Sequence, residues 1–459
     1  MNAALKESPV NQEPGTLKSR TLSAGMWVGA GSMLGNVIRL GSNLIVARLL
    51  FPEAFGLMMI ATAVTVIVTM LSDVGIQQSI IRGSHGENPV FLDTAWTFQI
   101  LRGFFIWLGV CCVAYALTVV VDRSWISKNS TYADPTLPWI MAVISATAVI
   151  QGFQSTDLAM ASRKLTMKRV VLLELVVQVV SVITMCALAW WLRSVWAAVA
   201  SGLLSALLHS TLSHFALRLH RHRLHIDQNA FRELFSFGKW VALSSTAYIF
   251  VVNGDRLILG VLVTPQIMGL YSIAVALATV FDQTLSTIFN KVILPAISEV
   301  ARNRPDQLAR IFYHLRWRLD PAVVLLGGAL FALGPAIVGT LYDSRYIQAG
   351  EMLQILSLGL VLGRLTLVQQ VYLALNEPRY LVILNAARVL SLLAVPLAFQ
   401  VYGLTGALFA IAFRELPVLP IIFWLNKKHN LNNFRLELLW LTMWPVGWLL
   451  GRAVLVVFN

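Results

Sequence analysis

The chain has 459 residues, of which 57% are hydrophobic and only 12% are charged. Soluble domains carry about twice that charged fraction, so the composition excludes an ordinary water-soluble protein. The formal net charge of +13 does not call for nucleic acid as a partner, because basic residues gather on the inner side of membrane proteins.

Apolar stretches of about 20 residues, the length of a bilayer-spanning helix, recur along the chain. Residues 1–21 are polar and contain Pro9 and Pro14, so we expect a disordered cytoplasmic tail without a cleavable signal peptide. The pattern predicts an all-α polytopic membrane protein with thirteen spans, and the boundaries permit twelve to fourteen. The predicted spans are 22–47, 54–79, 94–121, 136–158, 169–192, 196–217, 238–262, 270–291, 320–342, 350–375, 380–401, 404–425 and 437–457.

Residues 41–63 and 254–276 repeat one pattern, GSNLIVARLLFPEAFGLMMIATA and GDRLILGVLVTPQIMGLYSIAVA. Ten of the 23 positions are identical at a constant offset of 213, including Pro52 and Gly56. Because six spans separate the copies, both cross the membrane in the same direction. Parallel repeats of this kind are found in many secondary transporters.

The repeat predicts two six-helix lobes, and the polar stripes described below predict a central cavity between them. Residues 22–217 would form the N-terminal lobe, 218–237 a basic cytoplasmic linker and 238–425 the C-terminal lobe, while 426–459 would add one more span. With the N-terminus in the cytoplasm, 23 Lys and Arg residues fall on inside-facing parts and 6 on outside-facing parts. This asymmetry predicts the orientation. Residues 292–319 look amphipathic and predict a helix lying in the inner interface.

Charged residues inside the predicted spans mark the candidate site, because each costs about 2.5–3.5 kcal/mol at the helix centre. In the first span Ser32, Asn36, Arg39 and Asn43 are spaced to share one helical face. Polar stripes on spanning helices must face protein or water, so several stripes together predict a hydrated cavity. Asp73 and Asp157 lie nearer the inner surface. The charged residues deep inside the predicted spans are Arg39, Arg102, Arg256, Arg364, Arg388, Arg414, Glu174, Asp255, Asp282 and Glu415.

The excess of arginine in this set favours an anionic ligand, since the planar guanidinium binds phosphate through two oxygens. Our candidate ligand-binding residues are Arg39, Asn36, Asn43, Arg102, Arg256, Arg364 and Arg388. For each of them a purely structural role in holding helices together is about equally plausible. Asp282 is the first candidate for ion coupling and Asp255 the second.

No catalytic group, cofactor or metal site is expected. His220, His222 and His225 stand among arginines in a predicted cytoplasmic loop, which favours lipid contact over metal binding. Cys111, Cys112 and Cys186 lie in predicted spans and are read as packing residues. The sequence contains no Walker-type loop, HExxH or CxxC motif, so we do not expect an enzyme.

Several motifs resemble the polysaccharide-transporter branch of the multidrug/oligosaccharidyl-lipid/polysaccharide exporter superfamily, which includes the O-antigen and exopolysaccharide flippases. They are LSDVGIQQSIIRG (71–83), NGDRLILG (253–260), GLYSIAVAL (269–277), KVILPAIS (291–298) and LYDSRYIQAGEMLQIL (341–356). The resemblance implies two lobes that alternate between inward- and outward-facing states.

The resemblance also implies a flippase that moves polyprenyl-pyrophosphate-linked oligosaccharide units across the bacterial cytoplasmic (inner) membrane for surface or exopolysaccharide synthesis. Expected partners are that lipid-linked oligosaccharide, membrane lipids, and a polysaccharide polymerase with its export machinery. The alternative function is multidrug or small-molecule efflux within the same superfamily. An integral-membrane polymerase or glycosyltransferase is disfavoured, because the predicted outer loops are short.

Overall fold

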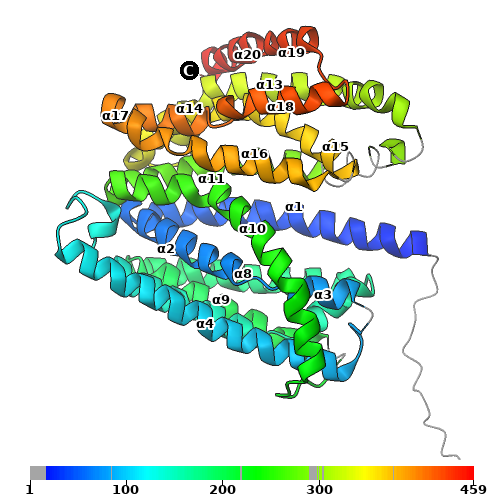
Figure 1. The fold of residues 1–459 in the computed structure, drawn as a ribbon. Coiled ribbons are helices and arrows are strands. Elements are labelled where there is room, and N and C mark those ends of the chain that lie inside the picture. Colours follow the sequence, from blue (N-terminus) through cyan, green and yellow to red (C-terminus); the bar gives the residue numbers. More distant parts are fainter. Residues whose placement is uncertain are drawn as a thin grey trace, which may run out of the picture.

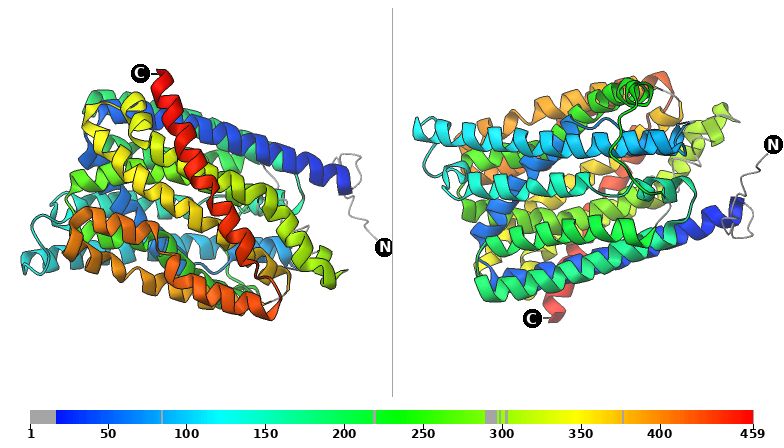
Figure 2. Two further views of the ribbon diagram at one scale, coloured as in Figure 1. Left: turned by 90° about the horizontal axis from the view of Figure 1, so that it is seen from above. Right: turned by 90° about the horizontal axis from the view of Figure 1, so that it is seen from below.

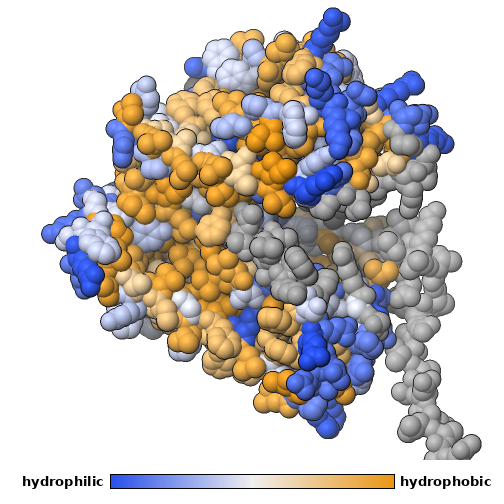
Figure 3. Space-filling model, in the orientation of Figure 1, coloured by the Kyte–Doolittle hydropathy of each residue, from blue (hydrophilic) through white to orange (hydrophobic). Residues whose placement is uncertain are grey.

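The computed structural model describes residues 17–83, 85–217, 220–288, 297, 299–301, 304–375 and 377–458. All secondary-structure elements within these ranges are helical, which confirms the expected all-α class (Figure 1). Hydrophobic residues cover the middle of the face in Figure 3, and hydrophilic residues gather at its left and right ends. This distribution is the one expected of a multi-pass membrane protein.

The N-terminal half of the chain forms α1 to α9. Pro52 and Pro89 begin α2 and α4, where a missing N–H costs nothing, and the Asn88 side chain accepts a hydrogen bond from Val90 N at 2.9 Å to cap α4. The elements are α1 (Leu17–Leu49), α2 (Pro52–Leu71), α3 (Ile76–Arg82), α4 (Pro89–Asp122), η1 (Thr131–Ala133), α5 (Leu137–Ile144), α6 (Ala146–Gly152), α7 (Asp157–Arg163), α8 (Met167–Leu192) and α9 (Trp196–Ala216).

The C-terminal half begins with α10, whose first turn is capped by Asp227 accepting from Asn229 N and Ala230 N. Its described elements are α10 (Gln228–Leu262), α11 (Pro265–Ile288), η3 (Pro305–Gln307), α13 (Leu308–Leu341), η4 (Ser344–Tyr346), α14 (Ile347–Gly363), η5 (Arg364–Leu367), α15 (Val368–Ala374), α16 (Pro378–Ser391), α17 (Ala394–Ala412), η6 (Leu416–Val418), α18 (Leu419–Lys428), α19 (Phe434–Leu441) and α20 (Met443–Phe458).

The chain reverses direction inside α17, at Gly403. This glycine has φ +60 and ψ −150, which only glycine adopts readily. A Cβ on Gly406 would come within 2.4 Å of the Ala398 carbonyl oxygen, although eight residues of straight helix would separate them by about 12 Å. The reversal matches the boundary that the sequence predicts between the spans 380–401 and 404–425.

Eight helices of the described residues are long and apolar enough to cross a membrane. A ninth span arises if Leu137–Gly152 and Asp157–Arg163, which are bent by 61°, are counted as one. Four of the thirteen predicted spans are not counted separately there. Helices α1 and α10 are 33 and 35 residues long but contain charged residues, and α11 qualifies only as a shorter apolar helix over Pro265–Val280. The stretch Arg379–Ala412 is counted as one span, although it contains all of the predicted span 380–401 and the beginning of 404–425.

One sequence expectation is wrong in detail. From Leu308 onward the predicted amphipathic segment 292–319 does not form a separate interfacial helix, because Leu308–Leu341 is one continuous helix, while residues 292–296, 298, 302 and 303 lie outside the described part of the chain. Its first turns are apolar on one face because Leu308 and Phe312 are buried against Leu367 and Val371. Figure 2 shows α20 crossing the face formed by α13 and α14.

The repeated sequence forms the contact between the two halves. Helices α2 and α11 lie side by side, and a Cβ on Gly56 would come within 2.1 Å of the Pro265 carbonyl oxygen. Reciprocally, a Cβ on Gly269 would come within 1.8 Å of the Pro52 carbonyl oxygen. Each glycine lies against the carbonyl group of the proline in the opposite copy, where a larger residue would not fit. This contact explains why both copies contain the same proline and the same glycine.

Equivalent carbonyl groups at the ends of α1 and α10 are capped by the opposite half. Ser130 Oγ donates to Gly260 O at 2.9 Å, and Arg345 Nη2 donates to Ala47 O, the equivalent position, at 3.2 Å. The next equivalent pair is capped by Thr131 Oγ1, which donates to Val263 O at 2.7 Å, and by Tyr346 OH, which donates to Leu50 O at 3.1 Å. These bonds join the halves at what we call the closed end.

Candidate functional site

A cavity of about 1230 Å³ lies between the two halves of the chain. Helices α1 and α8 supply the wall from the N-terminal half, and residues of α10, α11, α14 to α17 and η5 supply the opposite wall. The hydrogen bonds of the closed end join the two halves at one end of the helical bundle. The prediction of a polar cavity between the halves therefore agrees with the geometry of the described residues.

The α1 wall presents the predicted polar stripe. Ser32, Asn36 and Arg39 line the cavity, and Arg39 is exposed. Gly35, one turn before Arg39, permits α8 to approach, since a Cβ there would meet Gln178 Oε1 at 2.9 Å. Gln178 Nε2 instead donates to Gly35 O at 2.7 Å. This close packing fixes the stripe of α1 toward the cavity.

The α10 wall carries adjacent charges of opposite sign. Asp255 is 5% exposed and accepts a hydrogen bond from the Tyr271 hydroxyl of α11. Arg256 Nη1 donates to Asn253 Oδ1 at 3.1 Å, while its Nε–H has no hydrogen-bond partner among the described residues. Arg414 reaches the same cavity from the residues after α17, and its Nη1 donates to Val251 O at 3.4 Å.

Two other arginines line the cavity but are already paired with carboxylates. Arg388 Nε donates to both carboxylate oxygens of Glu415 at 2.9 and 3.0 Å, and Arg388 Nη1 donates to Asn385 Oδ1 at 2.9 Å. The Gln369 amide, oriented with its oxygen toward Arg388, also accepts from the guanidinium at 2.6 Å. Arg364 is 3% exposed and forms ion pairs with Asp320 and Glu437.

The described lining contains five arginines, Arg39, Arg256, Arg364, Arg388 and Arg414, and three carboxylates, Glu174, Asp255 and Glu415. The cavity is therefore basic overall, as the sequence predicted. Arg414 and Glu415 lie within a predicted span but are not among the candidate residues named from the sequence. Because Arg414 and Glu415 are neighbours in sequence, each needs a partner on another helix. Glu415 pairs with Arg388 of α16, and Arg414 donates to the backbone of α10.

Three candidates are not placed on the described lining. Arg102 of α4 donates to Thr69 O at 2.7 Å and lies 3.7 Å from Asp73, so it joins α4 to α2. Asn43 lies one turn beyond Arg39 on α1, near the closed end. The side chain of Asp282, the first candidate for ion coupling, lies outside the described part of the structure. Asp255 and the remaining candidates are brought together around one cavity.

The histidines of the predicted basic loop have a defined place in the structure. His220 Nε2 lies 2.8 Å from Asp93 Oδ1, and His222 Nε2 accepts from Thr156 N at 3.1 Å. Burial lowers the pKa of His222 to about 4. The described residues contain no group of three or more His, Cys, Asp or Glu arranged to hold a metal ion. These contacts fasten the segment 220–227 to the N-terminal half.

Comparison with known proteins gives a consistent family. Residues 45–348 match the family described as polysaccharide biosynthesis protein. The lipopolysaccharide biosynthesis protein WzxC of Escherichia coli (strain K12) is 22% identical over 317 residues, which cover 65% of this chain and 58% of WzxC. The aligned region thus spans less than two thirds of that relative.

Solved structures share the fold. The lipid II flippase MurJ in an inward closed conformation superposes with a TM-score of 0.67 at 13% identity, covering 93% of this chain and 98% of MurJ. An inward-facing multidrug resistance MATE family transporter of the MOP superfamily gives 0.60 at 15% identity, covering 95% and 98%. The structural likeness shows the fold, and the family match over residues 45–348 shows that the chain belongs to the polysaccharide biosynthesis protein family.

Proposed function

We propose that the protein is a flippase that moves a polyprenyl-pyrophosphate-linked oligosaccharide across the bacterial inner membrane by alternating access. The observation that carries this proposal is a set of three cavity arginines, Arg39, Arg256 and Arg414, none of which forms an ion pair with a described carboxylate. Three cations that have no carboxylate partner among the described residues, all beside one cavity, favour a multivalent anion.

The pyrophosphate group fits this preference better than a sugar or a lipid chain alone. Arginine offers up to five N–H donors, and each guanidinium can bind two phosphate oxygens at once. The buried Nε–H of Arg256 has no hydrogen-bond partner in the described part of the chain, which leaves this donor available to a ligand. Asn36, Ser32 and Thr279 on the cavity lining supply hydrogen-bonding groups suited to sugar hydroxyls.

The size and position of the cavity also suit a lipid-linked sugar. A volume of about 1230 Å³ exceeds the range of about 300–1,000 Å³ that drug-sized ligands occupy. The cavity lies between two halves that are joined at the closed end, so exchange of the open and closed ends would carry a polar head across the membrane. The prenyl chain would stay in the lipid. Relatives named for lipopolysaccharide biosynthesis and lipid II flipping support the same substrate class.

Multidrug efflux is the second candidate, because a MATE transporter shares the fold. Organic cations would require an acidic cavity, whereas this lining has five arginines against three carboxylates. The charge of the cavity therefore favours the flippase.

A reconstitution experiment separates the two functions. Purified protein in liposomes should flip a fluorescent polyprenyl-pyrophosphate oligosaccharide, as shown by loss of the signal to a membrane-impermeant quencher, and should not move a fluorescent organic cation. Protein-free liposomes provide the control. Transport of the cation without flipping of the lipid would establish the efflux function and reject our proposal.

A further inference from the structure

We infer that Glu437 is a positioning residue that serves as an internal counter-anion for Arg364, in competition with the phosphate of the substrate. This inference rests on the proposed function. It assigns a role to the segment that follows the repeated part of the chain, because Glu437 belongs to α19.

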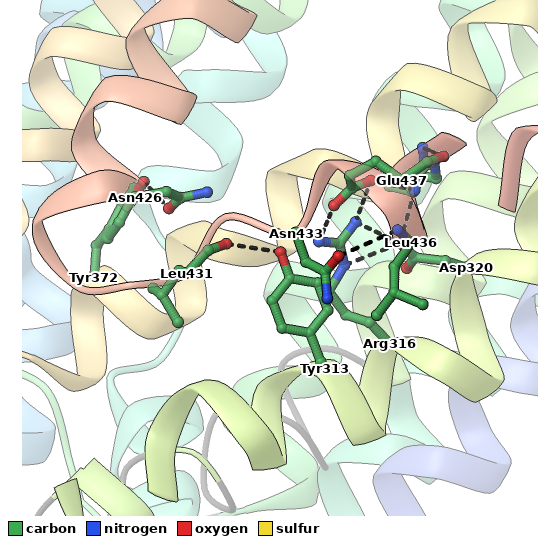
Figure 4. Close-up of polar contacts among 10 residues, drawn as sticks. Tyr313, Arg316, Asp320, Tyr372, Asn426, Leu431, Asn433, Leu436 and Glu437 are labelled. Atoms are coloured by element: carbon green, nitrogen blue, oxygen red, sulfur yellow. Dashed lines mark hydrogen bonds and ion pairs between the residues drawn. The ribbon is translucent and has the colours of Figure 1, made fainter. Parts of the chain in front are cut away.

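Glu437 belongs to a buried network of two arginines and two carboxylates (Figure 4). Arg316 and Asp320 stand one turn apart on α13, and Arg316 donates to both Asp320 and Glu437. Arg364 Nη1 donates to Asp320 Oδ2 at 2.9 Å and to Glu437 Oε2 at 2.7 Å. The four groups sum to zero formal charge, which makes their burial tolerable.

Arg364 is the member of this network that also lines the cavity. Its side chain is 3% exposed, and its Nε–H has no hydrogen-bond partner among the described residues. A buried donor without a partner costs free energy, so a ligand oxygen that satisfied it would bind favourably. Arg364 thus has one donor available to a ligand, while its charge is already balanced by two internal carboxylates.

The local backbone indicates which partner moves. Arg364 begins η5, a short 3₁₀ segment between α14 and α15, and a 3₁₀ segment within a helical span is often a hinge. Glu437 is held by a second arginine, because Arg316 of α13 donates to both of its carboxylate oxygens, and α19 leads directly into α20. A Cβ on Gly447 of α20 would come within 2.0 Å of the Leu325 carbonyl oxygen of α13, so α20 packs closely against α13. Trp440, beside Glu437, lies over both guanidinium groups, 4.9 Å from Arg316 and 5.7 Å from Arg364.

These contacts give Glu437 a function beyond structural pairing. When phosphate enters the cavity, Arg364 turns toward it and loses part of its contact with Glu437. When the substrate leaves, Arg364 forms its full ion pair with Glu437 again. The carboxylate therefore weakens ground-state binding and speeds release, which is useful because tight uniform binding slows turnover.

The test measures binding of inorganic pyrophosphate to the purified full-length protein by calorimetry, together with the flipping rate in liposomes. Glu437→Gln should tighten pyrophosphate binding by about fivefold or more and should lower the flipping rate at saturating substrate. Glu377→Gln is the matched control, because it removes one negative charge from an ion pair with Arg379 outside the cavity. A purely structural role for Glu437 would not tighten binding.

A double-mutant cycle tests whether Glu437 acts through Arg364. Arg364→Met should weaken pyrophosphate binding, and Glu437→Gln should have no further effect in that background, where Arg316 and Asp320 still balance each other. If Glu437→Gln fails to fold, Glu437→Asp should tighten binding in the same direction by a smaller factor. Unchanged affinity relative to the Glu377→Gln control, or tightening that persists without Arg364, would overturn the inference. Failure of the wild-type protein to bind pyrophosphate would reject the proposed function instead.

Discussion

Arg39 is the cavity arginine on which the residue-scale account depends most. It is exposed on the α1 wall, and among the described residues it forms no ion pair. Its guanidinium is therefore available to a ligand without first leaving a protein partner. Arg364 and Arg388 differ, because carboxylates already hold them. The five cavity arginines look equivalent in the sequence, but the structure separates them into two groups. Some are held by carboxylates, and the others have a guanidinium that can bind a ligand.

Arg39→Ala should weaken pyrophosphate binding about 10- to 100-fold, because a hydrogen bond to a charged group contributes about 1.5–3 kcal/mol. Arg39→Lys should recover only part of the affinity, since lysine lacks the two-pronged geometry. Calorimetric titration with pyrophosphate measures both. Arg102→Ala is the control, and it should lower thermal stability while leaving affinity intact, because Arg102 bonds to Thr69 O outside the described lining. Equal loss of affinity in both variants would contradict the assignment of Arg39.

Much of the site could be predicted from the helical spacing of polar residues, and the limits of that reasoning are visible on single helices. Asn36 and Arg39 share a face and do line the cavity, but Asn43, on the same predicted face, is not on the described lining. The spacing of polar residues shows which face of a helix is polar, but it does not show how far along the helix the cavity extends. Arg102 fits a polar pair with Gln99 equally well, yet Gln99 Nε2 donates to backbone carbonyls of α6 and the residues after it.

At the scale of elements, the segment 220–227 is held to α4 and α7 by histidine and aspartate contacts. His222 accepts a hydrogen bond from Thr156 N, and burial lowers its pKa from the ordinary value of 6.5 to about 4. The nearby titratable groups are Asp157, His214, His220 and Asp93, and the aspartates oppose this lowering only partly. His222 is therefore neutral at pH 7 and acts as an acceptor.

The lowered pKa of His222 predicts how stability depends on pH. Between pH 6.5 and about 4 the unfolded chain binds a proton at this position that the folded protein does not, so stability falls as the pH falls through this window. The wild-type Tm should decline over this range, and His222→Gln, which can accept the same hydrogen bond without titrating, should decline less steeply. Parallel Tm curves for the two proteins would show that His222 is not responsible.

The elements also show why the repeat is conserved within the chain while its polar residues differ. Pro52, Gly56, Pro265 and Gly269 are identical across the copies because they form the reciprocal backbone contact between α2 and α11. Asn43 aligns with Arg256 and Ser42 with Asp255, and in each pair only the residue of the second copy lines the cavity. Sequence identity between the copies marks the contact, and the differences between them mark the cavity.

At the scale of the whole molecule, the all-α class and the multi-pass architecture followed from composition alone, because twenty-residue apolar stretches leave few other solutions. The count of thirteen spans stays a prediction, because the eight or nine qualifying helices are counted over the described residues alone. A helix such as α1 is long enough to cross the membrane yet is polar on one face, and hydropathy cannot distinguish a cavity-lining span from a surface helix. The buried network of Arg316, Asp320, Arg364 and Glu437 was missed because its members come from three distant segments.

The account as a whole requires the closed end to open during transport. Arg345 crosses this end and donates to Arg48 O at 3.1 Å, and both side chains are partly exposed. Cysteines placed at Arg48 and Arg345 can therefore be linked by a short, reducible bifunctional thiol reagent, after replacement of Cys111, Cys112 and Cys186. A pair at Arg123 and Lys128, within one loop of one half at the same end, provides the control.

The decisive measurement is the flipping rate of a polyprenyl-pyrophosphate oligosaccharide by the Arg48→Cys/Arg345→Cys protein before linking, after linking and after reduction. Our account predicts that the linked protein still binds pyrophosphate but does not flip the lipid, and that reduction restores the rate, whereas the control pair flips throughout. Undiminished flipping by fully linked protein would show that the substrate does not pass between the two halves and would contradict the account.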